Sequence, residues 1–265
     1  ESLLAEAGQL AGAGVKELIL VAQDITRYGT DLYGRRRLAD LLEELCKLPF
    51  HWIRLHYLYP DEIDEALIDV IARQRKIVKY LDIPIQHLSD KILKSMHRRG
   101  DQALIHGVVK RLREHIPGVV LRTSIIVGFP GEGEAEFEEL CRLLPAYGFE
   151  RAGVFPFSCE EGTPAAGMPD QVDPEVARQR AERLMELQSR VMDAWNEDRL
   201  GETLEVLCEG FEPDMGCYVG RSYADSVEID NHVYFTAAGL IPAGEFVNVR
   251  ITGTQDGDLT GEIEE

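Results

Sequence analysis

Polar side chains follow apolar runs at several places in the sequence, and these are the residues most able to do chemistry. Gln86 and His87, for example, close the run that begins at Tyr80. In chain order the set is Gln23 and Asp24, His56 and Tyr57, Gln86 and His87, Arg122, Thr123 and Ser124, and Phe157, Ser158 and Glu160. Amide, imidazole and hydroxyl groups donate and accept hydrogen bonds, so the set favours a polar, largely neutral ligand. A lone His87 is more often a structural histidine, but the repetition favours a ligand site.

The segment "GFPGE", Gly128 to Glu132, is a second candidate. Its glycines allow close backbone approach, and the amides that open the next helix can face a polar or negative ligand edge. A simple turn explains the same residues equally well. Walker, G-x-S-x-G, H-E-x-x-H and dinucleotide motifs do not occur in the sequence.

These residues lie in a chain whose first 160 residues alternate between strand-like and helical patterns. The expected strands fall within residues 17–24, 52–60, 79–86, 119–130 and 149–158. Strands alternating with helices predict parallel β/α units. Because ligands bind at the carboxyl ends of such strands, the polar residues should converge there. We expect an α/β protein with a partial, TIM-like β/α barrel over residues 1–168, and a further strand before the helix that opens the chain.

A long helix and a small β module are expected after the barrel. Asp173 and Pro174 are typical of a helix start, and Gly201 of a helix end. We assign residues 169–200 to a linker helix. Short alternating strands then occupy residues 201–265, which predicts a five-stranded barrel of the oligonucleotide-binding type.

The net charge of -19 is concentrated at the end of the chain. Residues 201–265 hold 14 acidic and two basic side chains, a net charge of -12. A phosphate backbone requires Lys and Arg on the contact surface, so nucleic acid is disfavoured as a partner. An acidic module suits a basic protein, although solubility alone would also account for the charge.

Five cysteines are present, and none forms a C-x-x-C pair. Local spacing therefore supports no metal site in this chain, and the thiols suit a reducing compartment. Since no apolar run reaches the length of a membrane span and no signal peptide opens the sequence, we expect a cytoplasmic protein without membrane segments. The chain does not start with Met, and we expect it to be part of a longer protein.

The chain resembles the radical S-adenosylmethionine methylthiotransferases over essentially its whole length. The resemblance is carried by "LVAQDITRYGTDLYG", "YPDEI", "KYLDIPIQHLSDKILKSMHR", "LRTSIIVGFPGE" and "FPFSCEEGTPA", in that order. Residues 201–265 are similar to the TRAM domain that ends those enzymes. Members acting on transfer RNA tend to have Gly-Gln-Asn where this chain has Ala22-Gln23-Asp24, and a basic last domain. The branch that this chain resembles adds a methylthio group to an aspartate β-carbon of protein twelve of the small ribosomal subunit.

The resemblance implies S-adenosylmethionine and two [4Fe–4S] clusters as cofactors. One cluster is held by C-x-x-x-C-x-x-C, and the resemblance places the ligands of both clusters before Glu1. We therefore assign no metal ligand here and expect the chain by itself to be inactive. The implied cofactor-binding residues are Gln23, Asp24, Gln86, His87, Arg122, Thr123, Ile126, Gly128 and Phe155. Residues expected to bind the ribosomal protein are Arg221, Asp225, Glu228 and Asp230; no catalytic side chain is assigned.

Two other functions stay open at this point. A transfer-RNA methylthiotransferase would share the fold, and RNA binding with a steep salt dependence would identify it. A non-catalytic, partner-binding adaptor could have kept the scaffold and lost the cluster. The presence of C-x-x-x-C-x-x-C in the upstream gene sequence would distinguish an enzyme from such an adaptor.

Overall fold

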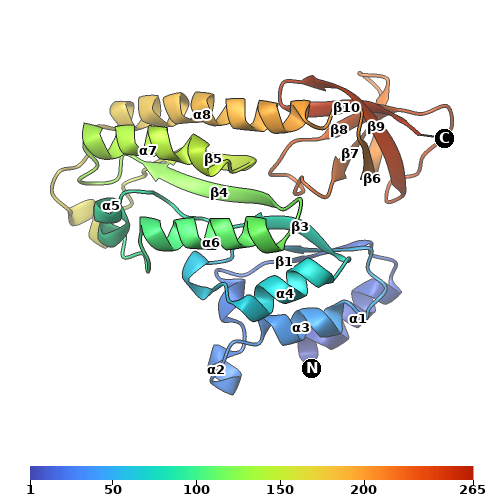
Figure 1. Cartoon of the computed structure of the whole chain (residues 1–265), viewed down its shortest axis with the longest axis horizontal. Helices are drawn as coiled ribbons and strands as arrows, with labels where there is room; N and C mark the ends of the chain where they lie inside the picture. Colours follow the sequence, from blue (N-terminus) through green and yellow to red (C-terminus); the bar gives the residue numbers. More distant parts are fainter. Residues whose placement is uncertain (265) are drawn as a thin grey trace. The chain divides into compact units, whose positions relative to one another are not determined.

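The computed structural model describes residues 1–264, which form two compact units (Figure 1). The first unit comprises Glu1–Gln188 and the second begins at Ser189. Helix α8 (Pro174–Glu197) starts in the first and ends in the second, so the chain divides within the helix that the sequence assigns as a linker. The side chain of Asp173 accepts a hydrogen bond from the Glu175 amide (2.8 Å), as expected of a residue at a helix start.

The first unit is built on a sheet of five parallel strands, which confirms the predicted α/β class and partial barrel. The strands are β1 (Glu17–Leu20), β2 (Trp52–Leu55), β3 (Ile77–Asp82), β4 (Val120–Val127) and β5 (Arg151–Pro156). They are ordered β1-β2-β3-β4-β5. Sequential order with parallel pairing brings all five carboxyl ends to one edge of the sheet.

One helix precedes β1, others connect successive strands, and together they cover one face of the sheet. They are α1 (Ser2–Gly12), α2 (Thr30–Tyr33), α3 (Leu38–Leu45), α4 (Glu65–Arg73), α5 (Asp90–Ser95), α6 (Gln102–His115) and α7 (Glu134–Tyr147). Short 3₁₀ turns span Ile25–Arg27, Pro60–Glu62 and Pro164–Gly167. Asp64 and Asp101 start α4 and α6 by accepting the amides of Leu67 (3.0 Å) and Leu104 (2.9 Å).

Alternate strand residues build the main apolar core with these helices. Ile53, Leu55, Leu81, Leu121 and Ile125 are buried in one cluster with side chains of α3, α4, α6 and α7. Because side chains alternate along a strand, the residues between them face the other way. That second face carries the polar side chains described below.

The second unit contains a closed five-stranded barrel, as predicted. Its strands are β6 (Thr203–Glu212), β7 (Cys217–Ser222), β8 (Val233–Thr236), β9 (Phe246–Gln255) and β10 (Asp258–Ile263), joined in the order β10-β8-β7-β6-β9. Val206, Phe235, Val249, Ile251 and Leu259 fill its interior. None of the helices within residues 1–264 combines the length and hydropathy that crossing a membrane requires.

Candidate functional site

Charged and aromatic side chains line the sheet face opposite the main core. Arg54 lies between Glu17, whose Oε1 accepts from Nε (2.8 Å), and the ring of Tyr80, whose centroid is 4.7 Å from the guanidinium carbon. One step closer to the carboxyl edge, Arg122 Nη1 donates to Asp82 Oδ1 (2.9 Å). All of these charges are buried, so the face is a preorganised polar surface rather than a second apolar core.

Asp82 is the unusual member of this face. One carboxylate oxygen is bonded to Arg122, whereas Oδ2 has no hydrogen-bond partner within residues 1–264 although it is fully buried. His56 Nδ1 lies 3.9 Å from Oδ2, which is beyond hydrogen-bonding distance. A buried acceptor without a partner is costly, so a donor on a bound molecule would stabilise this oxygen.

Gln86 stands at the carboxyl edge in an unfavourable backbone conformation. Its φ of +69° lies in the left-handed region, which a residue other than glycine occupies at a cost of about 1–3 kcal/mol. Two backbone hydrogen bonds hold it there: its amide donates to Ser124 O (2.9 Å) and its carbonyl accepts from the Ile126 amide (2.8 Å). Such strain is typical of functional sites.

A cavity of about 270 Å³ opens beside Gln86. Its lining residues are Gln86, Ser95, Met96, His97, Arg98, Ile126, Phe129, Thr163, Pro164, Ala165 and Met168. The walls are mostly apolar with a few polar groups, which is typical of a small-molecule site. Phe155 is half exposed and is paired in register with Ile126, so both side chains lie on the same face of the sheet.

His87 is fully buried and belongs to a hydrogen-bonded network. Its Nδ1 accepts from the Ser89 amide (2.9 Å), so the ring proton lies on Nε2, which donates to Glu132 Oε2 (3.3 Å). Arg180 of α8 donates from Nη1 to Glu132 Oε1 (2.7 Å) and to the Glu132 carbonyl (3.0 Å). The network ties the segment after β3, the loop after β4 and α8 together at the residue that follows Gln86.

Gly128 is buried at the end of β4 and is needed for close packing. Its φ is +76°, and a Cβ placed on it would collide with Ala177 of α8. The glycine therefore has a structural reason to be there. It brings α8 onto the loop that carries Glu132.

The other predicted cofactor-binding residues differ in how far they are exposed to solvent. Gln23 is exposed beyond β1, and Asp24 accepts from the amide and the hydroxyl of Thr26 at the start of a 3₁₀ turn. Thr123 is fully buried; its hydroxyl donates to Ile83 O (2.8 Å) and accepts from the Ile85 amide (3.2 Å). Thr123 thus fixes the chain that leads to Gln86.

The predicted partner-binding residues of the second unit are partly internal. Arg221 is buried and donates to Glu209 Oε1 (2.6 Å) and to Asp225 O (3.3 Å). Asp225 is buried too, and its Oδ2 accepts from the Ser222 hydroxyl (2.6 Å). Glu228 is exposed, and Asp230 is half-buried with Oδ2 accepting from the Ser226 amide (2.9 Å).

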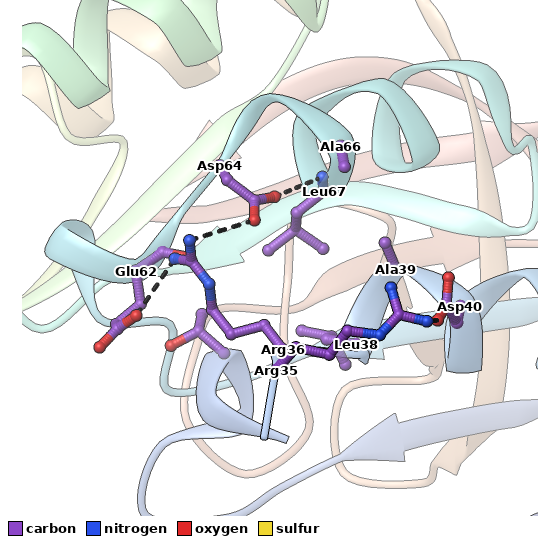
Figure 2. A pocket seen from close by; sticks show the side chains of 10 residues that line it. Arg35, Arg36, Leu38, Ala39, Asp40, Glu62, Asp64, Ala66 and Leu67 are labelled. Atoms are coloured by element: carbon purple, nitrogen blue, oxygen red, sulfur yellow. Dashed lines mark hydrogen bonds and ion pairs between the residues drawn. The ribbon is translucent and has the colours of Figure 1, made fainter. Parts of the chain in front are cut away.

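A second cavity, of about 330 Å³, lies between the loop before α3 and the start of α4 (Figure 2). Figure 2 shows Arg35 and Arg36 pointing in opposite directions, toward Asp40 and toward Glu62 and Asp64 respectively. Acidic partners compensate both guanidinium groups. None of the predicted site residues lines this cavity, whereas Gln86 and Ile126 line the cavity beside Gln86, which is therefore the candidate site.

Asp82, Glu132 and Arg180 escaped the sequence analysis as site residues. Asp82 has a recognisable signal, since it is a carboxylate inside the apolar run from Ile77 to Ile85. Glu132 ends a motif that the sequence did highlight, but its partners lie 45 and 48 positions away. A search of residues 1–264 finds no three His, Cys, Asp or Glu side chains placed to hold a metal ion.

The five thiols differ in accessibility, which predicts a simple labelling result. Burial raises the pKa of the Cys46, Cys141, Cys208 and Cys217 thiols above the usual value. Cys159 is the exposed thiol, in the loop after β5. We expect iodoacetamide at pH 8 to modify Cys159 first, as read by peptide mass spectrometry; faster labelling of Cys141 would contradict the structure.

Comparison with known proteins places the two units in two families of domains. The Radical SAM superfamily matches residues 1–144, and the TRAM domain matches residues 200–263. A protein of Acetivibrio thermocellus named ribosomal protein uS12 methylthiotransferase RimO is 50% identical over 99% of this chain and 58% of its own length. A protein of the same name from Pelobacter propionicus is 47% identical over 100% of this chain and 59% of its own length. The chain thus spans less than two thirds of these relatives.

Among solved structures, the radical SAM enzyme coproporphyrinogen III oxidase (HemN) from Escherichia coli has a similar fold. The TM-score is 0.58, with 14% identity over 83% of this chain and 58% of that chain. At this identity the likeness concerns the fold alone.

Proposed function

Because the chain belongs to the radical SAM superfamily, we propose that its protein is a methylthiotransferase acting on ribosomal protein uS12. The main support is the match of the whole chain to relatives that carry this name. We propose the β-carbon of an aspartate as the modified position, following the sequence resemblance.

We propose that S-adenosylmethionine occupies the cavity beside Gln86. The apolar wall that includes Ile126 suits the adenine ring, Phe155 can stack on a ring, and the Gln86 amide can bond to polar ligand atoms. Asp82 Oδ2 offers an acceptor that lacks a partner within residues 1–264. His87 then acts as a positioning residue behind Gln86. The bound cofactor, with its cluster, supplies the radical chemistry.

The remaining assigned residues receive narrower roles in the proposal. Gln23 and Asp24 approach the methionine end from β1, and Arg122 provides positive charge for a carboxylate. Thr123 and Gly128 act through the backbone that they fix. Two [4Fe–4S] clusters complete the proposed cofactor set. Since C-x-x-x-C-x-x-C does not occur in the sequence, we propose that residues 1–265 alone do not complete the reaction.

We expect Gln86→Ala and Arg122→Ala in the full-length protein each to weaken S-adenosylmethionine binding about 5- to 10-fold, the loss of roughly one hydrogen bond. Binding is measured at a temperature where both variants are folded, because Arg122→Ala also leaves the buried Asp82 without its ion-pair partner. Calorimetry measures the affinity, and reductive cofactor cleavage gives a second readout. Gln179→Ala removes an exposed amide on α8 and is the matched control. Unchanged affinity and cleavage in both site variants would refute the assignment.

The substrate is tested separately by mass spectrometry of uS12 and of transfer RNA after incubation with the full-length enzyme. A methylthio group on uS12 supports the proposal. A methylthio group on transfer RNA alone would instead identify the enzyme as a transfer-RNA methylthiotransferase.

A further inference from the structure

Two exposed apolar side chains of the second unit are linked through one tyrosine, and a third lies in the same hairpin as one of them. Phe211 (52% exposed) and Met215 (54%) belong to the β6–β7 hairpin, and Leu240 (87%) belongs to the loop between β8 and β9. Tyr218 links Phe211 to the Leu240 loop: its ring contacts that of Phe211 (centroids 5.1 Å apart), and its hydroxyl bonds to the residues on either side of Leu240. We call Phe211, Met215 and Leu240 the hairpin patch.

The hairpin patch is rigidly supported. The Tyr218 ring stacks on Phe235 of the barrel core, with centroids 5.5 Å apart. Its hydroxyl donates to Gly239 O (3.2 Å) and accepts from the Ile241 amide (3.3 Å), so the loop that presents Leu240 is fixed to the barrel. Apolar side chains exposed together on a rigid support are typical of a docking surface.

The negative charge around the hairpin patch favours basic partners over acidic ones. Glu212 and Asp214 lie in the same hairpin, and residues 201–265 carry 14 acidic against two basic side chains. This field repels phosphates and attracts Lys and Arg. The strands described form a closed barrel, so a partner is recognised by side chains and not by adding a strand to a free edge.

We propose that the hairpin patch docks a basic protein segment that also presents an apolar side chain. This inference rests on the proposed function, from which the segment belongs to uS12. It replaces the sequence-based choice of Arg221 and Asp225, because those side chains are buried and hold their own loop. Glu212 and Asp214 provide attraction, and the apolar residues provide the contact that excludes water.

The test measures the affinity of the full-length protein for purified uS12 by biolayer interferometry. Leu240→Ser is the decisive variant, since an 87% exposed side chain contributes little to folding. We expect it to weaken binding about tenfold, and Phe211→Ser to act in the same direction. The control is Leu200→Ser, which changes another exposed apolar residue (48%) of the same unit and should leave the affinity within about twofold.

The outcomes separate the two proposals. If the unsubstituted protein binds uS12 and Leu240→Ser binds equally well, the docking inference is wrong and the proposed function stands. If Leu200→Ser weakens binding as much as Leu240→Ser, the docking surface is not the hairpin patch. Failure of the unsubstituted protein to bind uS12 overturns the proposed partner and the inference together.

Discussion

Glu132→Ala is expected to destabilise the first unit by about 3 kcal/mol, the low end of the cost of breaking a buried ion pair, because Arg180 keeps only the exposed Glu134 carboxylate (3.3 Å) as an acidic partner. Arg180 is buried and donates to Glu132 Oε1 (2.7 Å), and His87 Nε2 donates to Oε2 (3.3 Å). Alanine removes both acceptors at once. The loss is local to the first unit, so hydrogen exchange of the β3 and β4 amides measures it better than a single global melting curve.

Two further variants test whether this buried network contributes more to stability than an exposed ion pair does. Glu138→Ala breaks an exposed ion pair with Arg183 on α7 and α8, and we expect little change in exchange rates from it. Glu132→Gln keeps the shape of the side chain but loses the charge, so it should retain more stability than alanine. If Glu132→Ala and Glu138→Ala are equally mild, the network does not carry the stability that its burial implies.

The network also predicts an effect on the cofactor. Gln86 keeps a left-handed φ of +69° only because neighbouring residues hold it, and His87 follows directly in the chain. Glu132→Gln should therefore weaken S-adenosylmethionine binding under conditions where the protein remains folded. Hydrogen exchange at Gln86 and Ile126, with calorimetry on the same sample, distinguishes a positioning role from general destabilisation.

The sheet could be predicted from the sequence because parallel strands are buried on both faces. Such strands appear as nearly continuous apolar runs, and each of the five runs became a strand. Their shared direction then placed the polar residues at one edge. The approximate position of the site follows from this topology and requires no side-chain detail.

The contacts within the site could not be predicted, because they join residues far apart in the chain. His87 meets Glu132 across 45 positions, and Arg180 meets it across 48. Nothing in the local pattern distinguishes a His that faces a ligand from one that faces a buried Glu. The same limit applies to Arg221 and Asp225, whose charges suggest a surface although the loop buries them.

Strand β10 shows a third reason why sequence alone does not predict the whole structure. Asp258–Ile263 reads "DLTGEI", with polar residues and a glycine in the middle, so the apolar alternation that marks a strand is weak there. A Cβ at Gly261 would collide with the carbonyl oxygen of Arg250 on β9. The glycine that weakens the sequence signal is the one that lets the two strands approach and close the barrel.

Gly128→Ala is expected to cost about 3–5 kcal/mol, because two penalties combine. The φ of +76° strains any side-chain-bearing residue by about 1–2 kcal/mol, and the new Cβ would also collide with Ala177, which cannot move without moving α8. Gly131→Ala is the matched control: it shares a positive φ (+85°), but an added Cβ meets nothing within 4 Å among residues 1–264. Gly131→Ala should therefore lose only the stability that the positive φ costs, without the collision.

The double variant Gly128→Ala with Ala177→Gly identifies the collision directly. Ala177→Gly alone weakens a helix by about 1 kcal/mol. In the Gly128→Ala background it also removes the Cβ that the new methyl group meets, so the double variant should be more stable than Gly128→Ala alone. Hydrogen exchange across β4 and the first turns of α8 measures the coupling. Strictly additive effects would show that α8 does not rest on Gly128.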